Sequence, residues 1–335
     1  MEGIRFLTAQ RRRRQSSASF LSVLVLLAAC TSQPGDDARG APAAPPETAS
    51  PSPTSRPNKV TSAQARCRQR VAKVKHQQFV PETNREGARE VLPAVFPDGS
   101  TAELVYPPAL NIEELGLQPA VSAGIVRGKH RFAAVRFLLI TKTPIKKFRS
   151  EDPAIKTYEG ASGTVKVRRA KDPEEFLNPV FLHFRIGTWN ILVGDGNVGT
   201  FMGARNRRLW AENLDGYETE NGFIVLDPRP PLVIGTGPGG PDLWFSECFR
   251  FVEFRLEECR DLKAAELAKK QTAQVVRDVT VYRSKSGGQF HANWCTPSRR
   301  VSVYLDDRNK RFVDLAVKRL RVRNVELSEV AKSDD

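Results

Sequence analysis

Short runs of alternating apolar and polar residues dominate the chain from about residue 80 onward. The alternation is clearest at residues 181–186, where Leu182, Phe184 and Ile186 fall on one face of an extended segment. Such a run predicts a strand with one buried face and one polar face. The polar face carries His183, which is therefore expected to be exposed or hydrogen-bonded rather than a metal ligand.

A hairpin is predicted at residues 91–106, because Pro97-Asp98-Gly99 supplies turn chemistry between two apolar runs. Other short apolar runs predict strands at residues 133–141, 164–168, 189–193, 222–226, 231–234, 249–256, 279–282, 301–305 and 313–322. Helical composition is confined to residues 63–79, which are basic, and residues 261–274, which are rich in Ala, Leu, Glu and Lys. Together with 23 glycines and 23 prolines, these runs predict a mainly β (β-rich α+β) fold. We expect an antiparallel sandwich or a curved sheet with one or two short helices.

The first thirty residues have the pattern of an export signal. Arginines at positions 11–14 precede an apolar run at residues 20–29, which is too short to span comfortably a hydrocarbon core of roughly 30 Å. The run ends in Leu27-Ala28-Ala29-Cys30, which resembles the lipobox of bacterial lipoproteins. The resemblance implies removal of residues 1–29, acylation of Cys30 (palmitate among the acyl chains) and a lipid anchor on the extracytoplasmic face of the cell membrane. A plain signal peptide with an incidental cysteine is the alternative.

Residues 30–60 are dense in Pro, Ala, Ser and Thr and contain no aromatic residue. Such a segment buries too little apolar area to offset its ordering entropy, so it is predicted to be a disordered tether behind the lipidated cysteine. Residues 61–330 are predicted to form a β-rich extracytoplasmic domain, as one unit or two subdomains. Residues 331–335 are predicted to be a disordered tail.

The chain is basic, with a formal net charge of +14. Residues 1–29 contain five Arg and one Glu, so the chain from Cys30 onward carries +10. Arg319, Arg321 and Arg323 recur at period two, and a strand would place them on one face, where they would suit anionic lipid headgroups or an anionic envelope polymer. An ordinary solvated face is the alternative. Export makes nucleic acid an improbable partner.

Four further cysteines, Cys67, Cys248, Cys259 and Cys295, suggest two disulfides in an oxidising compartment. Residues 249–257 contain no turn former, so a strand or a helix there would separate Cys248 from Cys259 by far more than the roughly 7 Å that a disulfide tolerates. Cys67 is then expected to pair with one of the three later cysteines, most plausibly Cys248 or Cys259. Such a bridge would tie the start of the body to its C-terminal half.

Two glycine-rich segments and one acidic pair are the candidate chemistry. Residues 194–199 match GxGxxG, but Asp227 lies farther away than the usual spacing, and residues 200–220 make a poor amphipathic helix, so a turn-rich β loop is favoured over a dinucleotide site. Residues 235–240 lack the Lys-Ser/Thr of a P-loop. Asp242 and Glu247 could act as a carboxylate pair, although chance pairs are common among 38 acidic residues.

His291 lies in a segment, residues 289–297, that also contains Trp294 and Cys295 and is interpreted as a packed loop held by a disulfide. We find no catalytic motif of the GxSxG, SxxK or HExxH type, and no spacing typical of a metal site, so no catalytic residue, metal or cofactor is assigned. The sequence favours a membrane-tethered, non-enzymatic binding or scaffold module of the cell envelope. The alternative is an envelope hydrolase acting on wall glycan or peptide, with Asp242, Glu247 or His291 in its site.

Overall fold

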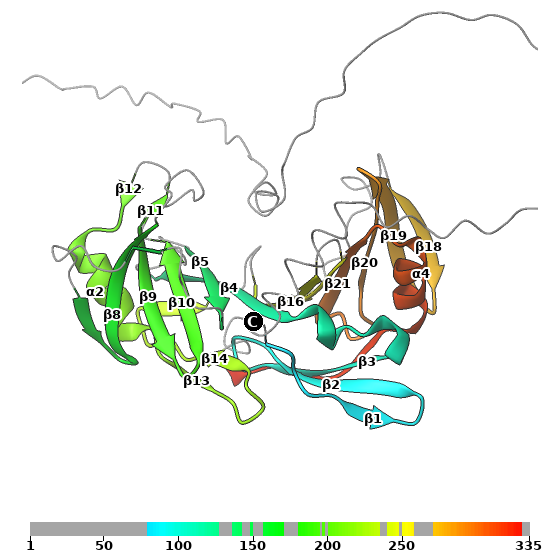
Figure 1. The fold of residues 1–335 in the computed structure, drawn as a ribbon, viewed down its shortest axis with the longest axis horizontal. Helices are drawn as coiled ribbons and strands as arrows, with labels where there is room; N and C mark the ends of the chain where they lie inside the picture. Colours follow the sequence, from blue (N-terminus) through cyan, green and yellow to red (C-terminus); the bar gives the residue numbers. More distant parts are fainter. Residues whose placement is uncertain are drawn as a thin grey trace, which may run out of the picture. The chain divides into compact units, whose positions relative to one another are not determined.

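The structure is a computed structural model that describes residues 79–126, 136–142, 148–149, 157–170, 180–194, 196–197, 200–234, 240–247, 250–257 and 271–329. Strands make up 58% of the described residues and form antiparallel sheets (Figure 1). The predicted mainly β fold class is therefore confirmed.

One sheet of 14 strands organises the body. Its hydrogen-bonded order is β18-β19-β20-β21-β17-β16-β4-β5-β10-β9-β8-β6, with β15 also paired to β4 and β7 also paired to β8. In chain order its strands are β4 (Leu117–Ile125), β5 (Arg136–Thr141), β6 (Phe148–Arg149), β7 (Thr157–Gly160), β8 (Gly163–Ala170), β9 (Val180–Ile186), β10 (Trp189–Gly194), β15 (Leu232–Ile234), β16 (Asp242–Glu247), β17 (Arg250–Leu256), β18 (Thr272–Val276), β19 (Val279–Ser286), β20 (Gln289–Cys295) and β21 (Val301–Asp307).

A second sheet has four strands in the order β1-β2-β3-β22, namely Asn84–Glu86, Arg89–Val95, Thr101–Tyr106 and Arg321–Glu326. Its β2–β3 hairpin confirms the one predicted from Pro97-Asp98-Gly99. Gly99 has a φ of 86°, and its amide donates to the carbonyl of Phe96 over 2.9 Å. Because a side chain at this φ is strained, glycine suits the position.

The remaining elements are short. They are the 3₁₀ turns η3 (Pro108–Leu110) and η4 (Glu113–Leu115), the hairpins β11–β12 (Gly196–Asn197, Thr200–Phe201) and β13–β14 (Gly216–Glu218, Ile224–Leu226), and the helices α2 (Ala204–Asn213) and α4 (Lys310–Arg319).

Two hydrophobic clusters form the core, and strand β4 contributes to both. Leu117, at the start of β4, belongs to the cluster that gathers side chains from both sheets and from α4. Val121 and Ile125, farther along β4, belong to a second cluster built on β5, β8, β9, β10 and α2. Since β4 pairs with β16 over its first half and with β5 over its second, the large sheet is continuous between the two clusters.

Helix α4 overturns the strand predicted at residues 313–322 over residues 313–319, whereas residues 321–322 belong to strand β22. Phe312, Val313, Ala316 and Val317 are buried, at the spacing of one helical face. Asn309 caps the helix by accepting a hydrogen bond from the amide of Arg311 over 3.0 Å. Val313, Leu315 and Val317 do occur at every second position, as a strand would require. Packing against β20 and β21 buries the helical face instead, so this segment is a helix.

Two further sequence interpretations are corrected. The stretch at residues 200–220, judged a poor helix, contains α2, whose Trp210 and Ala211 are buried in the second cluster. The helix predicted at residues 261–274 does not include its last three residues, because Thr272–Val276 is strand β18, paired with β19. The first ten residues of that predicted helix lie outside the described part.

The export signal, Cys30, the tether and nearly all of the predicted helix at residues 63–79 lie outside the described residues. The last residue of that helix, Phe79, is described and forms a β-bridge with Leu117. The chain divides into two compact units at Pro57/Asn58, and every described residue belongs to the second unit. Among the described residues, no helix is both long enough and apolar enough to cross a membrane.

Candidate functional site

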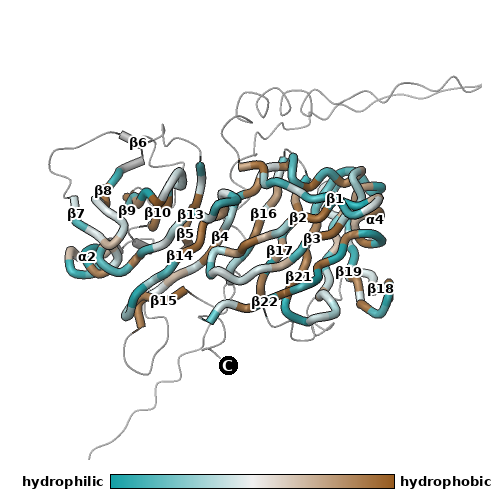
Figure 2. The backbone as a smooth tube through the Cα atoms, turned by 90° about the horizontal axis from the view of Figure 1, so that it is seen from below, coloured by the Kyte–Doolittle hydropathy of each residue, from teal (hydrophilic) through white to brown (hydrophobic). Residues whose placement is uncertain are grey.

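The strands at the centre of the large sheet have one apolar face and one mixed face. On β17, Val252 and Phe254 are buried in the first cluster, whereas Phe251, Glu253 and Arg255 point to the opposite side and are half-buried. The same alternation of burial occurs on β21 and on the second half of β20. Figure 2 shows the hydropathy of the residues along β16, β17 and β21. Register therefore brings the mixed-face residues of neighbouring strands side by side.

Five aromatic rings cross this mixed face from strand to strand, and we call them the aromatic row. Phe137 of β5 stacks on Trp244 of β16, with ring centroids 5.7 Å apart. Trp244 is 6.0 Å from Phe251 of β17, which in turn is 6.0 Å from Tyr304 of β21. His291 of β20 ends the row, 6.3 Å from Tyr304.

All five rings lie outside both hydrophobic clusters, and Phe137 remains 46% exposed. Four spacings of about 6 Å are typical of aromatic pairs in contact, so the rings form one connected row. The row spans six neighbouring strands, of which β4 contributes no ring, and its Trp244 is buried.

Beside the row, one arginine binds two carboxylates. Nε of Arg255 is 3.1 Å from Oδ1 of Asp242, and a terminal nitrogen of Arg255 is 2.5 Å from Oε1 of Glu253. Burial raises the pKa of Asp242 to about 8, despite the attraction of Arg255. Burial also raises the pKa of Glu253. One cation cannot fully compensate two buried carboxylates, so this group favours retaining a proton.

At the other end of the row, His291 contacts two residues of β21. Its Nδ1 lies 3.0 Å from the hydroxyl of Tyr304 and 3.7 Å from Oδ2 of Asp306. Burial, followed by the charges of Asp306 and Glu253, raises the pKa of Tyr304 to about 12. Tyr304 therefore keeps its proton over the physiological range.

The predicted carboxylate pair of Asp242 and Glu247 is not formed. The two residues are five positions apart on β16, so they point to opposite faces and are separated by about 17 Å along the strand. Glu247 is instead paired with Arg250 over 2.8 Å. The carboxylate that accompanies Asp242 is Glu253, which the sequence reading missed. In the sequence, the spacing of Glu253 and Arg255 indicates only that the two side chains share a strand face. The register of β16 with β17 is what places Glu253 near Asp242.

The two histidine interpretations had different outcomes. His183 is hydrogen-bonded, as expected: Nε of Arg168 lies 2.9 Å from its Nδ1, and Asn190 Oδ1 lies 2.9 Å from its Nε2. The segment around His291 was interpreted as a loop, but residues 289–295 are strand β20. Pairing with both β19 and β21 holds this polar sequence extended.

The described residues of the GxGxxG segment, 194, 196 and 197, lie in β-strands, in line with the β loop favoured from the sequence. Gly194 ends β10, and Gly196 begins the antiparallel hairpin β11–β12. A dinucleotide site would need a parallel strand–helix–strand unit here. Of the second glycine-rich segment, residues 235–239 lie outside the described part.

Cys295 ends β20 and is disulfide-bonded. Cys30, Cys67, Cys248 and Cys259 lie outside the described residues, so the connectivity stays a prediction. The strand on which we based the exclusion of a Cys248–Cys259 bridge is present as β17.

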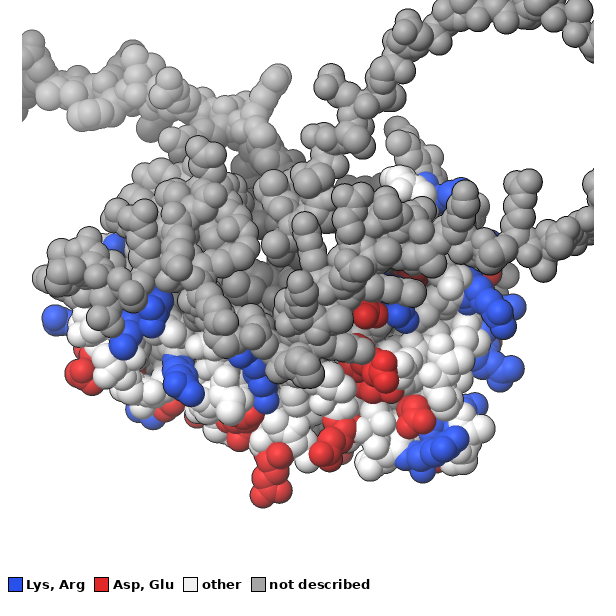
Figure 3. All heavy atoms as spheres, in the orientation of Figure 1, with Lys and Arg blue, Asp and Glu red and all other residues white. Residues whose placement is uncertain are grey.

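The three arginines near the C-terminus do not share a strand face. Arg319 ends α4, whereas Arg321 and Arg323 lie on β22. Arg323 is ion-paired with Glu86 and Glu103, and Arg321 donates to the carbonyl of Lys318 over 2.9 Å. In Figure 3, basic and acidic side chains are interspersed over the described part of the visible face. Binding of these arginines to an anionic surface stays a prediction.

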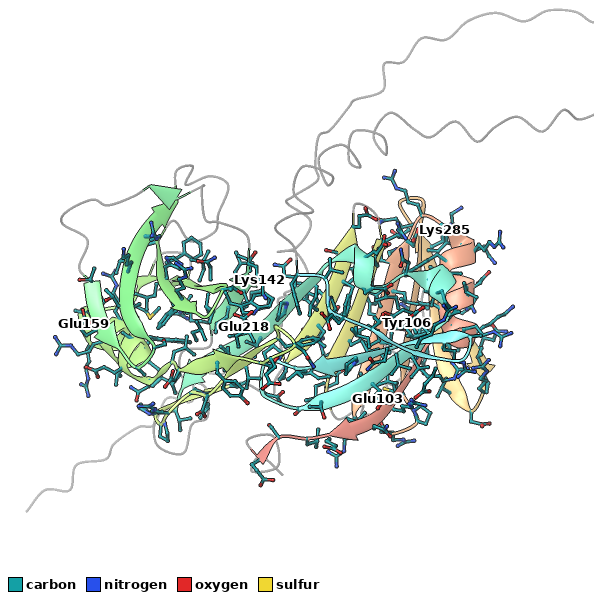
Figure 4. All side chains as sticks on the ribbon, turned by 60° about the horizontal axis from the view of Figure 1, so that its bottom comes forward. Glu103, Tyr106, Lys142, Glu159, Glu218 and Lys285 are labelled. Carbon is teal, nitrogen blue, oxygen red and sulfur yellow. The ribbon has the colours of Figure 1, made fainter. Side chains whose placement is uncertain are left out.

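A second polar cluster, centred on Lys142, satisfies its own groups. Nζ of Lys142 lies 2.7 Å from Oε1 of Glu218 (Figure 4) and 4.4 and 4.9 Å from the ring centroids of Phe79 and Trp189. Glu218 also accepts from the amide and hydroxyl of Thr188. The polar groups of Lys142 and Glu218 are therefore used in contacts within the fold, and we take the aromatic row as the candidate site.

Within the described ranges, no group of three or more His, Cys, Asp or Glu residues could hold a metal ion. Comparison with known proteins adds no identification: no protein-family model, curated protein or solved structure matches the chain. The candidate site therefore rests on the geometry of the mixed face.

Proposed function

We propose that this protein is a membrane-tethered extracytoplasmic lipoprotein whose β-rich body is a non-enzymatic binding module of the cell envelope. The aromatic row is its proposed binding surface. The lipobox supports the anchor. The row supports binding through its accessible rings, because Phe137 is 46% exposed and Phe251, Tyr304 and His291 are half-buried, whereas Trp244 is buried.

The arrangement of charges supports binding over catalysis. Asp242 and Glu253 both bind Arg255, so each carboxylate already has a partner. Residues held in this way position neighbouring side chains and keep the surface close to neutral. A catalytic carboxylate instead has to reach the bond that breaks.

The test is co-sedimentation of the full chain, purified in detergent micelles, with cell-envelope fragments. Phe137→Ala removes the most exposed ring of the row and is expected to weaken binding about fivefold or more, as loss of an aromatic contact does. Tyr217→Ala is the matched control, since Tyr217 is 56% exposed and lies on β13, outside the row. Equal weakening by both variants, or by neither, contradicts the proposed surface.

An envelope hydrolase acting on wall glycan or peptide is the second candidate function. The observation that favours it is Asp242, whose pKa of about 8 keeps it protonated at neutral pH beside Glu253. This is the state that a general acid needs. If the wild-type chain releases soluble fragments from envelopes and Asp242→Asn binds equally well without releasing any, the protein is the hydrolase.

A further inference from the structure

We infer that the His291 end of the aromatic row is a subsite for a neutral glycan, whose sugar rings stack on the row and whose hydroxyl groups hydrogen-bond to β20 and β21. This inference rests on the proposed binding function and names the class of ligand.

The first observation is a group of buried polar atoms without partners. Among the described residues, none supplies a hydrogen-bond partner to Nε2 of His291, Oδ1 of Asn293 or Oδ1 of Asp306. Buried polar atoms in native proteins are nearly always hydrogen-bonded, so each such atom calls for an explanation.

These three atoms belong to one small area of the sheet. His291 pairs directly with Asp306, and Asn293 pairs with Tyr304, in the ladder between β20 and β21. Residues opposite each other, or two positions apart, share a face, so all four side chains lie on the mixed face. Hydrogen-bonding capacity is thus concentrated where the aromatic row ends.

The chemistry of these atoms favours hydroxyl and amide groups in the ligand. Oδ1 of Asn293 and of Asp306 accept hydrogen bonds, and Nε2 of His291 donates or accepts, depending on its tautomer. A sugar hydroxyl can meet either role, since it both donates and accepts. The rings of Tyr304 and Phe251 beside them meet edge to face at 62°, and each offers apolar ring atoms to the C–H face of a sugar.

Charge argues against an anionic polymer at this place. Asp306 lies at the subsite and Glu253 is the direct neighbour of Tyr304 in the ladder between β17 and β21. Arg255, the nearby cation of β17, is already bound to Asp242 and Glu253. Phosphate groups would therefore meet carboxylates rather than a free cation, whereas a neutral glycan carries no such penalty.

The experiment is titration calorimetry of the full chain in detergent micelles with two soluble probes, a tetramer of N-acetylglucosamine and a tetramer of α-1,4-linked glucose. Saturable binding of at least one tetramer is expected. His291→Ala and Asn293→Ala are expected to weaken that binding about tenfold or more, since each removes a hydrogen-bonding group from the subsite. His183→Ala is the matched control, because His183 is also half-buried on a strand but lies on β9.

Thermal melts accompany each variant. If His291→Ala fails to fold, Tyr304→Phe takes its place: it keeps the ring, removes the hydroxyl that contacts His291, and is expected to weaken binding about threefold or more. Unchanged affinity in a folded subsite variant overturns the inference.

Three further outcomes separate this inference from the proposed function. If neither tetramer binds while envelope co-sedimentation still depends on Phe137, the glycan subsite is wrong and the binding module stands. If a polyglycerol-phosphate oligomer binds through His291 and the sugars do not, the ligand class is wrong as well. Loss of envelope binding altogether contradicts the proposed function itself.

Discussion

At the scale of single residues, the balance of charge around Arg255 governs the candidate site. Asp242 is only 1% exposed and shares this cation with Glu253. The folded protein therefore binds a proton at Asp242 more tightly than the unfolded chain does, since burial raises the pKa from 3.8 to about 8. The free energy of unfolding must therefore fall as the pH rises through this interval, because the folded state loses a proton that it binds more tightly than the unfolded chain does.

The first prediction follows from this sign. Between pH 6.5 and 8.5, the melting temperature of the wild-type chain is expected to fall by roughly 3–6 °C more than that of Asp242→Asn, which cannot ionise. This pH range lies above the pKa of Asp307, which burial raises to about 6, so Asp307 contributes little to the change in melting temperature. Parallel melting curves for the two proteins would show that Asp242 ionises normally.

A close backbone approach gives the second prediction. A Cβ atom on Gly160 of β7 would meet the carbonyl oxygen of Ala211 in α2, and that oxygen cannot move without shifting the helix. Gly160→Ala is expected to lower stability by about 2 kcal/mol, as overpacking does, or the melting temperature by roughly 4–8 °C. Gly203→Ala is the control, since its Cβ would enter open space; because Gly203 is the N-cap of α2, a smaller loss of about 1 kcal/mol at most, or roughly 2–4 °C, is expected. Equal melting temperatures for the two variants would contradict the packing of α2 on β7.

At the scale of elements, local pattern predicted most of the described strands and missed the two described α-helices, α2 and α4. Residues 181–186 and the hairpin around Gly99 have one consistent period and one clear turn, so their strands were predictable. Residues 312–317 fit two periods at once, because Val313 and Val317 suit both an alternating strand and a helical face. Only packing against β20 and β21, which lies beyond any local window, selects helix α4.

Strand register also restricts the disulfides. Cys295 and Arg255 both pair with Ser302 of β21, so Cys295 lies level with the C-terminal end of β17. Arg250, at the other end of β17, is five residues from Arg255 and thus about 17 Å away along the strand. Cys248 precedes Arg250 by two residues in the sequence, and a disulfide needs Cα atoms within roughly 7 Å, so we predict that Cys248 is not the partner of Cys295.

The third prediction is therefore the pairing Cys259–Cys295 together with Cys67–Cys248. Cys259 follows the last residue of β17 by three positions in the sequence, and Cys295 lies level with that end of β17. Peptide mapping under non-reducing conditions decides the connectivity. A peptide linking Cys248 to Cys295 would contradict the register of β17, β21 and β20.

At the scale of the whole molecule, the fold class was predictable and the site was not. Alternation along each strand is a local property of the sequence, so a mainly β body followed from it. The aromatic row joins Phe137 to Tyr304 through five strands whose order in the sheet differs from their order in the chain. Without knowing the order of the strands in the sheet, the sequence predicts neither the ring contacts of Trp244 nor the ion pair of Asp242 with Arg255.

The fourth prediction concerns the anchor. Cys30→Ala removes the acylated thiol that the lipobox implies, and a lone export signal leaves no other strong hold on the bilayer. The variant is expected in the soluble envelope fraction or the medium, whereas the wild-type chain stays in carbonate-washed membranes. Equal retention of both proteins would contradict lipidation at Cys30.

The central claim, that the mixed face of the sheet is a binding surface, is tested most directly by hydroxyl-radical footprinting. The full chain is oxidised with and without envelope fragments, and modification is read at Phe137, Phe251 and Tyr304, with Tyr217 as the reference. The account predicts that envelope fragments protect these three residues of the row while Tyr217 is oxidised to the same extent in both samples. Unchanged oxidation of the row in the presence of bound envelope material, or protection at Tyr217 alone, would contradict it.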